Sequence, residues 1–145
     1  MKKLNILLIG GTKDASNITK HIKEKYDSYI LTTTTTEYGS KLAIESGSDD
    51  TIAKPLLKDE FITLIETNEF NLLIDATHPY ASHITQTTVS LSKLFNITYI
   101  RFERPPSNLD NVDTSRVHEV TSLDEAGKLI ASDFTSGNVL HLAGA

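Results

Sequence analysis

Residues 4–15, which read LNILLIGGTKDA, decide the fold class of this 145-residue chain. Residues 4–9 are apolar apart from Asn5, as is typical of a strand buried on both faces of a sheet. Gly10 and Gly11 end this run, and a pattern with apolar residues three and four positions apart follows. A buried strand, a glycine turn and an amphipathic helix in this order predict the first unit of a parallel α/β sheet.

The same alternation of short apolar strands and amphipathic helices continues along the chain. The predicted strands are residues 29–34, 51–53, 71–76, 97–102, 117–120 and 139–142. A predicted helix spans residues 37–45, with Gly47 as its stop. Two further helices follow, one with Phe61, Leu64 and Ile65 inward and a longer one with Tyr80, Ile84, Thr88, Leu91 and Phe95 on one face. The capping box of Ser122 and Glu125 begins the last predicted helix. Because strands and helices alternate throughout, we expect a Rossmann-like, doubly wound α/β fold with a parallel sheet.

The composition narrows the classes of partner. The formal net charge is −5 and the 14 basic residues are scattered, so we expect neither nucleic acid nor a membrane surface as a partner. The absence of cysteine excludes disulfides, thiolate metal sites and a cysteine nucleophile. The apolar stretch at residues 6–9 is shorter than the ~7–15-residue core of a signal peptide, and no run approaches the ~20 apolar residues of a membrane span. We therefore expect a cytoplasmic protein.

The glycine turn is the first candidate binding site, formed by Gly10, Gly11, Thr12 and Lys13. Glycine lets the backbone approach a phosphate, and the helix behind the turn directs its free N–H groups and positive end at the anion. In nucleotide-binding α/β folds this first turn holds the pyrophosphate. The match to G-x-G-x-x-G is partial, since Thr12 stands where the second glycine belongs, so a plain strand-to-helix turn is the alternative.

The threonine run at residues 32–36 ends the second predicted strand. NAD-specific domains place an acidic residue about 20 residues past the glycine loop, where it binds the ribose hydroxyls. The hydroxyls of Thr33, Thr34 and Thr36 suit instead a 2′-phosphate, which no carboxylate repels there. We therefore expect NADPH or NADP as the cofactor, with Lys13 as a positive charge near the 2′-phosphate. The alternative is that β-branched threonines simply suit a strand.

Residues 75–81, DATHPYA, form the third candidate site at the carboxyl end of a buried strand. Open α/β sheets bind ligands at this edge. Thr77, His78 and Tyr80 converge there, and His78 is suited to acid chemistry near pH 7. The alternative is a capping segment, in which Thr77 or His78 caps the next helix and the histidine faces solvent. The other histidines lack the spacing of metal ligands, so no metal site is predicted.

Three blocks, in order, resemble the precorrin-6A reductase family of cobalamin biosynthesis, which includes the cobalt-precorrin-6A reductases. The blocks are residues 8–12 (LIGGT) with Asp14 and Ala15, residues 34–39 (TTTEYG) and residues 75–81 (DATHPYA). Residues 99–105 (YIRFERP) also match, and the third block is the most specific. The resemblance runs from residue 1 to about residue 143.

The resemblance implies a two-domain, NADPH-dependent reductase. Such an enzyme reduces the precorrin-6A or cobalt-precorrin-6A macrocycle to its dihydro form, with this corrinoid precursor bound between the domains. Carried onto this sequence, the resemblance implies that Gly10, Gly11 and Thr12 contact the pyrophosphate. Thr33, Thr34 and Thr36 would line the adenosine end or the edge of the second strand. Thr77, His78 and Tyr80 would face the nicotinamide and the substrate. His78 and Tyr80 are the implied catalytic residues. Arg101 and Arg104 are implied as ligands of the macrocycle's carboxylates, with surface pairing to Glu103 as the alternative.

Members of that family run on by about another 100 residues, a domain's length. Residues 139–142 predict a strand that runs into Gly144, as at the start of another strand–helix unit. We therefore expect residues 1–135 to form an NADP-binding Rossmann-like domain and residues 136–145 to begin a truncated second domain. A natural terminal strand is the alternative.

Two other functions fit the same patterns. One is a generic NADP-binding oxidoreductase of the short-chain type, which usually carries a Tyr-x-x-x-Lys pair. No tyrosine here is followed four residues later by lysine, which disfavours that class. The other is a non-catalytic nucleotide-binding domain. The sequence leaves open whether the substrate carries cobalt and what the oligomeric state is.

Overall fold

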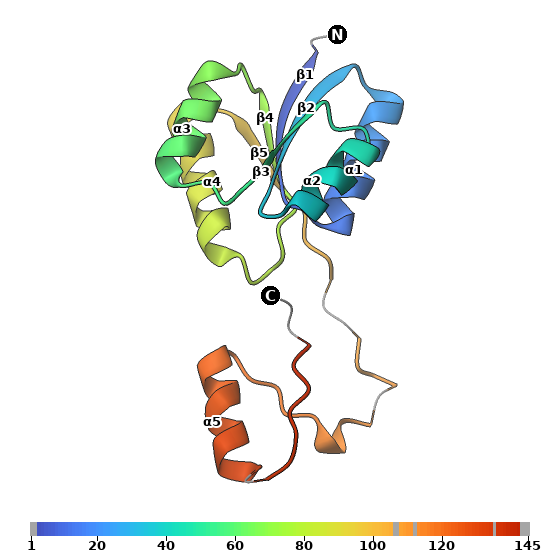
Figure 1. Cartoon of the computed structure of the whole chain (residues 1–145), viewed down its shortest axis with the longest axis vertical. Coiled ribbons are helices and arrows are strands. Elements are labelled where there is room, and N and C mark those ends of the chain that lie inside the picture. Colours follow the sequence, from blue (N-terminus) through green and yellow to red (C-terminus); the bar gives the residue numbers. More distant parts are fainter. Residues whose placement is uncertain (1–2, 106–107, 112, 135, 143–145) are drawn as a thin grey trace. The chain divides into compact units, whose positions relative to one another are not determined.

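The computed structural model describes residues 3–105, 108–111, 113–134 and 136–142, and the chain divides into two compact units, Met1–Pro105 and Pro106–Ala145. The first unit contains a five-stranded sheet with helices α1 to α4 (Figure 1). The second contains helix α5 (Leu123–Asp133). All the candidate site residues therefore lie in the first unit. The expectation that residues 136–145 begin a further domain stays a prediction.

The sheet of the first unit has five parallel strands in the order β3-β2-β1-β4-β5. They are β1 (Leu4–Ile9), β2 (Ser28–Thr34), β3 (Asp50–Ala53), β4 (Leu72–Asp75) and β5 (Thr98–Arg101). Strand β1 pairs with β2 and with β4, so that Ile9 stands opposite both Thr33 and Asp75. This order confirms the doubly wound α/β fold. In such sheets ligands bind at the carboxyl ends of the strands where the order reverses, which is here between β1 and β4.

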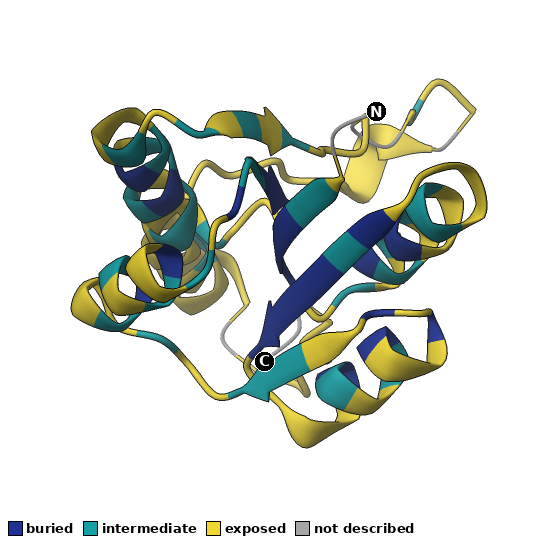
Figure 2. Ribbon diagram, turned by 90° about the horizontal axis from the view of Figure 1, so that it is seen from above, coloured by how far each residue is buried: buried dark blue, intermediate teal, exposed yellow. Residues whose placement is uncertain are grey.

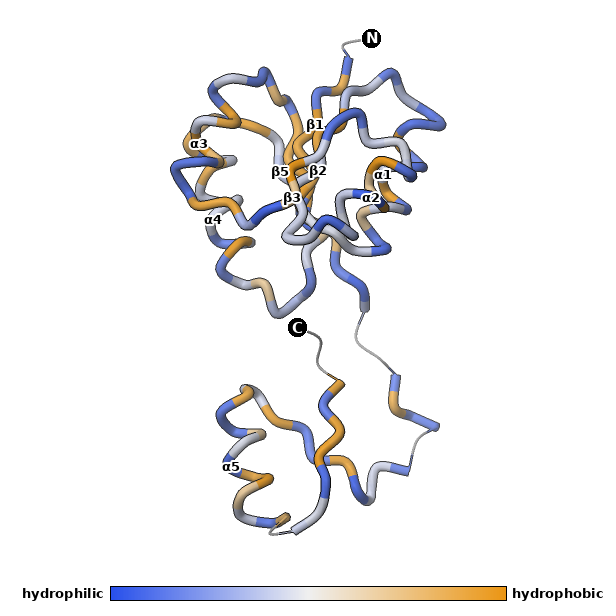
Figure 3. Tube along the Cα trace, in the orientation of Figure 1, coloured by the Kyte–Doolittle hydropathy of each residue, from blue (hydrophilic) through white to orange (hydrophobic). Residues whose placement is uncertain are grey.

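Helices cover both faces of the sheet (Figure 1). Helices α1 (Lys13–Lys25) and α2 (Glu37–Glu45) lie on one face, and α3 (Lys58–Thr67) and α4 (Ser82–Phe95) lie on the other. Strand β1 supplies both cores, because Ile6 and Leu8 face the α1 side while Leu7 and Ile9 face the α3 and α4 side. Its uninterrupted apolar run follows from this burial on both faces, and the central strands are among the most buried (Figure 2) and hydrophobic (Figure 3) parts of the chain. No helix in the described ranges is long and apolar enough to cross a membrane.

Local signals set both ends of α2 as predicted. The Thr36 hydroxyl accepts a hydrogen bond from the N–H of Gly39 at 3.1 Å, which caps the start of the helix. Gly47, with φ of 105°, follows the C-cap residue Ser46 in the left-handed region, where glycine carries no Cβ penalty.

Helix α4 begins two residues beyond Tyr80, at Ser82, and this corrects two predictions. The N–H of Ala81 donates to the carbonyl of His78 at 2.9 Å, which makes a turn ahead of the helix. Tyr80 belongs to this turn and is 78% exposed, so the prediction that it lies on the inward helix face is wrong. Ala81 occupies the N-cap position without a side-chain hydrogen bond, so neither Thr77 nor His78 caps the helix.

The second unit confirms one predicted helix and contradicts two predicted strands. The Ser122 hydroxyl accepts from the N–H of Glu125 at 3.1 Å and opens α5, although the Glu125 carboxylate bonds the N–H of Thr121 instead of that of Ser122. Residues 117–120 follow a short 3-10 helix (Thr114–Arg116) and, like residues 139–142, form no strand. Apolar residues alone do not make a strand, because a strand needs a hydrogen-bonded neighbour, and Val139, Leu140 and Leu142 lie exposed. Residues 143–145 lie outside the described residues.

Candidate functional site

The turn after β1 lies against the end of β4, and Gly10 makes this approach possible. Gly10 has φ of 135°, a region that side chains rarely allow. A Cβ at Gly10 would lie 2.8 Å from the carbonyl oxygen of Ala76. The turn therefore crosses the sheet at the point where the strand order reverses, and only glycine fits there.

Gly11 and Gly39 bring the same turn into contact with α2. A Cβ at Gly11 would lie 3.2 Å from the Cβ of Thr34, and a Cβ at Gly39 would lie 3.1 Å from the same atom. Gly39 belongs to the TTTEYG block but was not predicted as a site residue. Its role depends on contact with a turn 28 positions away along the chain, and the glycine inside a predicted helix was the available signal.

Thr12 holds the turn in place through its hydroxyl. Its Oγ1 accepts from the N–H of Ala15 at 3.1 Å, capping α1, and donates to the carbonyl oxygen of Ala76 at 3.0 Å. The side chain of Thr12 is thus engaged inside the protein. The first-turn N–H groups of α1, which have no acceptor within the helix, are the groups suited to an anion, and the exposed Lys13 stands beside them.

The predicted threonines have different surroundings. Thr33 and Thr34 are buried, and the Thr34 hydroxyl donates to the carbonyl oxygen of Thr36 at 2.9 Å. Thr36 is exposed, and its hydroxyl caps α2. The structure therefore places Thr36 at the surface of the carboxyl edge, whereas Thr33 and Thr34 support this edge from inside.

Asp75, which begins the predicted DATHPYA site but was given no role there, forms a buried hydrogen-bonding centre. Its side chain is 0% exposed and accepts from the amide and hydroxyl of Thr77, at 3.0 and 2.7 Å, and from the hydroxyls of Thr85 and Tyr99, at 2.7 and 2.9 Å. Arg101 Nη1 lies 2.7 Å from its Oδ1. A charged residue that ends a buried apolar strand was the available signal, but its partners come from a loop, a helix and another strand.

Burial and hydrogen bonding act in opposite directions on this carboxyl. Burial alone would raise the pKa of Asp75, but the hydrogen bonds from Thr77, Thr85 and Tyr99 outweigh it and hold the pKa below its usual range. Burial, together with the hydrogen bond to Asp75, raises the pKa of Tyr99 to about 12. Asp75 is therefore an anion near neutral pH, and Tyr99 is a neutral donor.

The two predicted arginines are both paired with carboxylates of this chain. Arg101 is 19% exposed and also donates to the carbonyl oxygen and hydroxyl of Thr77, at 3.1 and 2.9 Å, while Glu103 is 3.9 Å away. Arg104 is 68% exposed, and its Nε lies 2.9 Å from Oδ2 of Asp14 in the first turn of α1. The main partner of Arg101 is thus a buried carboxylate and not the surface residue Glu103.

His78 and Tyr80 lie together on the exposed turn between β4 and α4. Their ring centroids are 4.9 Å apart with the planes tilted by 42°. The N–H of Tyr80 donates to Nδ1 of His78 at 3.3 Å, which leaves Nε2 as the protonated nitrogen of the neutral ring. His78 follows directly on Thr77, whose polar groups bond to Asp75 and Arg101.

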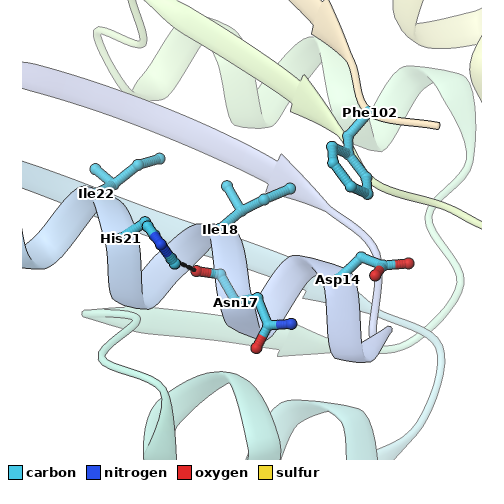
Figure 4. A pocket seen from close by; sticks show the side chains of 6 residues that line it. All are labelled: Asp14, Asn17, Ile18, His21, Ile22 and Phe102. Atoms are coloured by element: carbon cyan, nitrogen blue, oxygen red, sulfur yellow. Dashed lines mark hydrogen bonds between the residues drawn. The ribbon is translucent and has the colours of Figure 1, made fainter. Parts of the chain in front are cut away.

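A pocket of 340 Å³ lies beside the glycine turn, between α1 and the residue that follows β5 (Figure 4). Its lining residues are Asp14, Asn17, Ile18, His21, Ile22 and Phe102. In the close-up Phe102 faces α1 across the opening, and Nδ1 of His21 is 3.0 Å from the carbonyl oxygen of Asn17. Within the described ranges no group of three or more His, Cys, Asp or Glu side chains is arranged to hold a metal ion.

Comparisons with known proteins agree on one family. The sequence model described as "Precorrin-6x reductase CbiJ/CobK" matches residues 5–145. Proteins named cobalt-precorrin-6A reductase are similar to this chain: the one from Methanococcus maripaludis is 37% identical over 142 residues, and the one from Methanocaldococcus jannaschii is 36% identical over 141 residues. Each match covers 97% of this chain and 54% of the relative. The chain thus spans about half the length of these curated relatives.

Solved structures agree on the fold. The structure titled "CobK precorrin-6A reductase" superposes with a TM-score of 0.69 at 20% identity, over 89% of this chain and 47% of that one. A short-chain alcohol dehydrogenase from E. coli CFT073, complexed with NADH, superposes with a TM-score of 0.50 at 18% identity, over 74% of this chain and 32% of that one.

Proposed function

Because this chain belongs to the Precorrin-6x reductase CbiJ/CobK family, we propose that it is the nucleotide-binding half of an NADPH-dependent reductase of the precorrin-6A or cobalt-precorrin-6A macrocycle in cobalamin biosynthesis. The observation that carries the proposal is the glycine turn at the point where the strand order reverses. The rest of the substrate site is proposed to lie in the part of the relatives that this chain does not cover, since each match spans 54% of the relative. The enzyme acts in the cytoplasm.

The cofactor fits the residues of the turn. A Cβ at Gly10 would meet the backbone of Ala76, and a Cβ at Gly11 would meet the side chain of Thr34. The two glycines therefore let the turn pack closely on its neighbours, which brings the first turn of α1 to the point where the strand order reverses. The first-turn N–H groups of α1 would bind the phosphate oxygens. When bound, NADPH supplies the hydride, and the protein positions the reacting groups and supplies a proton. The dehydrogenase complexed with NADH shows that a related fold accommodates a dinucleotide.

Recognition of the 2′-phosphate is proposed for Lys13 and Thr36. Strand β2 ends in threonines, and the exposed Lys13 begins α1. We expect Lys13→Ala to weaken NADPH binding about tenfold, a loss of about 1.4 kcal/mol, and to leave NADH binding unchanged. Titrating the chain with each nucleotide measures this. Lys20→Ala, an exposed lysine in the middle of α1, is the matched control, and equal weakening by both variants would contradict the role of Lys13.

Proton transfer to the macrocycle is proposed for His78, with Tyr80 packed against it. The exposed His78 ring lies at the carboxyl edge, and as the imidazolium it would donate a proton and be left as neutral imidazole. We expect His78→Ala to lower the kcat of the full-length enzyme by about 100-fold, within the usual range for general acid catalysis, with little change in the KM for NADPH. His83→Ala, an exposed histidine on α4, is the control. Unchanged turnover of the His78 variant would remove it from the mechanism.

The function itself is tested by titrating the chain with NADPH and assaying the full-length protein on precorrin-6A and cobalt-precorrin-6A. Tight NADPH binding with reduction of either macrocycle supports the proposal. Absence of NADPH binding would contradict the nucleotide site. NADPH binding without reduction by the full-length protein would favour a non-catalytic nucleotide-binding domain.

A further inference from the structure

The proposed function does not explain why the buried carboxylate of Asp75, at the carboxyl edge, accepts so many hydrogen bonds. Five donor groups from three elements reach one carboxylate: the amide and hydroxyl of Thr77 in the loop, the hydroxyl of Thr85 on α4, and Tyr99 and Arg101 on β5. The proposed chemistry uses none of these groups directly. Stability alone is a weak reason for such an arrangement, since well-packed apolar residues often replace a buried ion pair without loss.

The hydrogen bonds converge on one residue, Thr77. Asp75 binds its amide and its hydroxyl, and Arg101 Nη1 binds its carbonyl oxygen and its hydroxyl. Every polar group of Thr77 is therefore bonded to the ion pair. The position and direction of the backbone are fixed at the residue where the chain leaves the sheet.

His78 and Tyr80 begin immediately beyond this anchor. Both are exposed, and their described contacts are with one another and with the turn that carries them. The helix that follows lacks a side-chain cap, so no capping interaction holds the turn from that side. The anchor at Thr77 therefore determines where the two rings stand relative to β1 and the glycine turn.

We propose, on the basis of the reductase function proposed above, that Asp75 is a positioning residue that acts with Arg101 through Thr77 to hold His78 and Tyr80 at the nicotinamide end of the cofactor site. Arg101 belongs to this anchor and is not a ligand of the substrate's carboxylates. Catalytic groups require placement to within a fraction of an ångström, and hydrogen bonds from the surrounding shell supply it.

The test compares Asp75→Asn with Asp49→Asn in the full-length enzyme. Asp49 is a matched control, because it also pairs with a cation, Lys23 at 2.6 Å, and accepts a backbone N–H, that of Ile30 at 2.8 Å, but it lies just before β3 at the opposite edge of the sheet. We expect Asp75→Asn to lower kcat at least tenfold while the KM for NADPH stays within threefold. Asp49→Asn lowers the melting temperature but leaves kcat unchanged. Unchanged kcat in the folded Asp75 variant would overturn the proposal.

A second measurement does not depend on the reaction. In ¹⁵N relaxation experiments on the nucleotide-free chain, we expect the order parameters of His78 and Tyr80 to fall from about 0.85 to below about 0.6 in Asp75→Asn. Asp49→Asn leaves them unchanged. If the wild-type enzyme reduces neither macrocycle but the order parameters fall, the proposed function is wrong and the anchor stands. If they stay high, the anchor is wrong even where the enzyme is active.

A milder variant covers the case in which Asp75→Asn does not fold. Thr85→Val removes the 2.7 Å hydrogen bond to Oδ2 of Asp75 and keeps the shape of the side chain. We expect the same effects as in Asp75→Asn but smaller ones: kcat falls about threefold, and the order parameters of His78 and Tyr80 fall in part. Wild-type values of both quantities in this variant would contradict the anchor.

Discussion

Replacing Arg101 with methionine is expected to lower the free energy of unfolding by about 3 kcal/mol, the low end of the range for a broken buried ion pair. The reason is that Asp75, with a side chain that is 0% exposed, keeps its charge but loses the cation 2.7 Å away. Arg101 is itself 19% exposed, so water reaches part of the pair and the loss stays at the low end. Urea unfolding at pH 7 measures this difference.

Arg104→Met is the matched control for that experiment. Arg104 also pairs with a carboxylate, Asp14 at 2.9 Å, but it is 68% exposed. Ion pairs of this kind contribute about 0–1 kcal/mol, so we expect a change within that range. Equal losses in both variants would contradict the view that burial of Asp75 gives the Arg101 pair its effect.

The pH dependence of stability provides an independent check on the same pair. The pKa of Asp75 is lowered by folding, so its contribution is fully present above the unfolded value near 3.8 and is lost as the pH falls through the folded value. Arg101 also favours the ionised carboxylate, because its Nη1 lies 2.7 Å from Oδ1 of Asp75, so its removal makes the lowering of the Asp75 pKa smaller. We therefore expect the Arg101→Met variant to lose less stability than the wild type between pH 5 and pH 2. The other acidic groups with lowered pKa are common to both proteins and cancel in the comparison.

The fold could be predicted from the sequence where a local signal sets each element. The helix at Glu37–Glu45 was predicted with its bounds, and Gly47 was predicted as its stop, because a glycine acts on neighbouring residues; the cap by Thr36 is also local but was not predicted. Strand β1 was predicted because burial on both faces leaves a continuous apolar run. The strands predicted at residues 117–120 and 139–142 failed for the opposite reason, since pairing with a neighbouring strand is not a local property.

The candidate site could be predicted only in part, for the same physical reason. The glycine turn and the DATHPYA block are contiguous in sequence, and the structure places both at the carboxyl edge between β1 and β4. Asp75, by contrast, accepts hydrogen bonds from Tyr99 and Arg101, which are distant along the chain. They lie beside Asp75 because β5 pairs with β4, and the local sequence does not show this pairing. Arg101 was accordingly given only two roles, a ligand of the substrate's carboxylates or a surface partner of Glu103, whereas the structure shows it paired with a buried carboxylate.

Gly10→Ala is expected to weaken NADPH binding at least 100-fold and to lower the free energy of unfolding by on the order of 3 kcal/mol. Alanine at φ of 135° is strained, and its Cβ would lie 2.8 Å from the carbonyl oxygen and 2.9 Å from the carbonyl carbon of Ala76. These are backbone atoms of the segment that follows β4, so they cannot rotate away as a side chain would. The turn must therefore move, and the N–H groups behind it move with it. NADPH titration and thermal unfolding of the same sample measure both effects.

Gly47→Ala separates backbone strain from loss of the site. Gly47 has φ of 105°, but a Cβ there would meet only the Lys23 side chain, at 3.4 Å from its Cγ. We expect a loss of about 1–2 kcal/mol of stability from strain alone and unchanged NADPH affinity, because Gly47 follows α2 far along the chain from the glycine turn. If Gly10→Ala bound NADPH as well as Gly47→Ala does, the pyrophosphate would not lie on the turn, and the plain strand-to-helix turn would be the correct interpretation of residues 10–13.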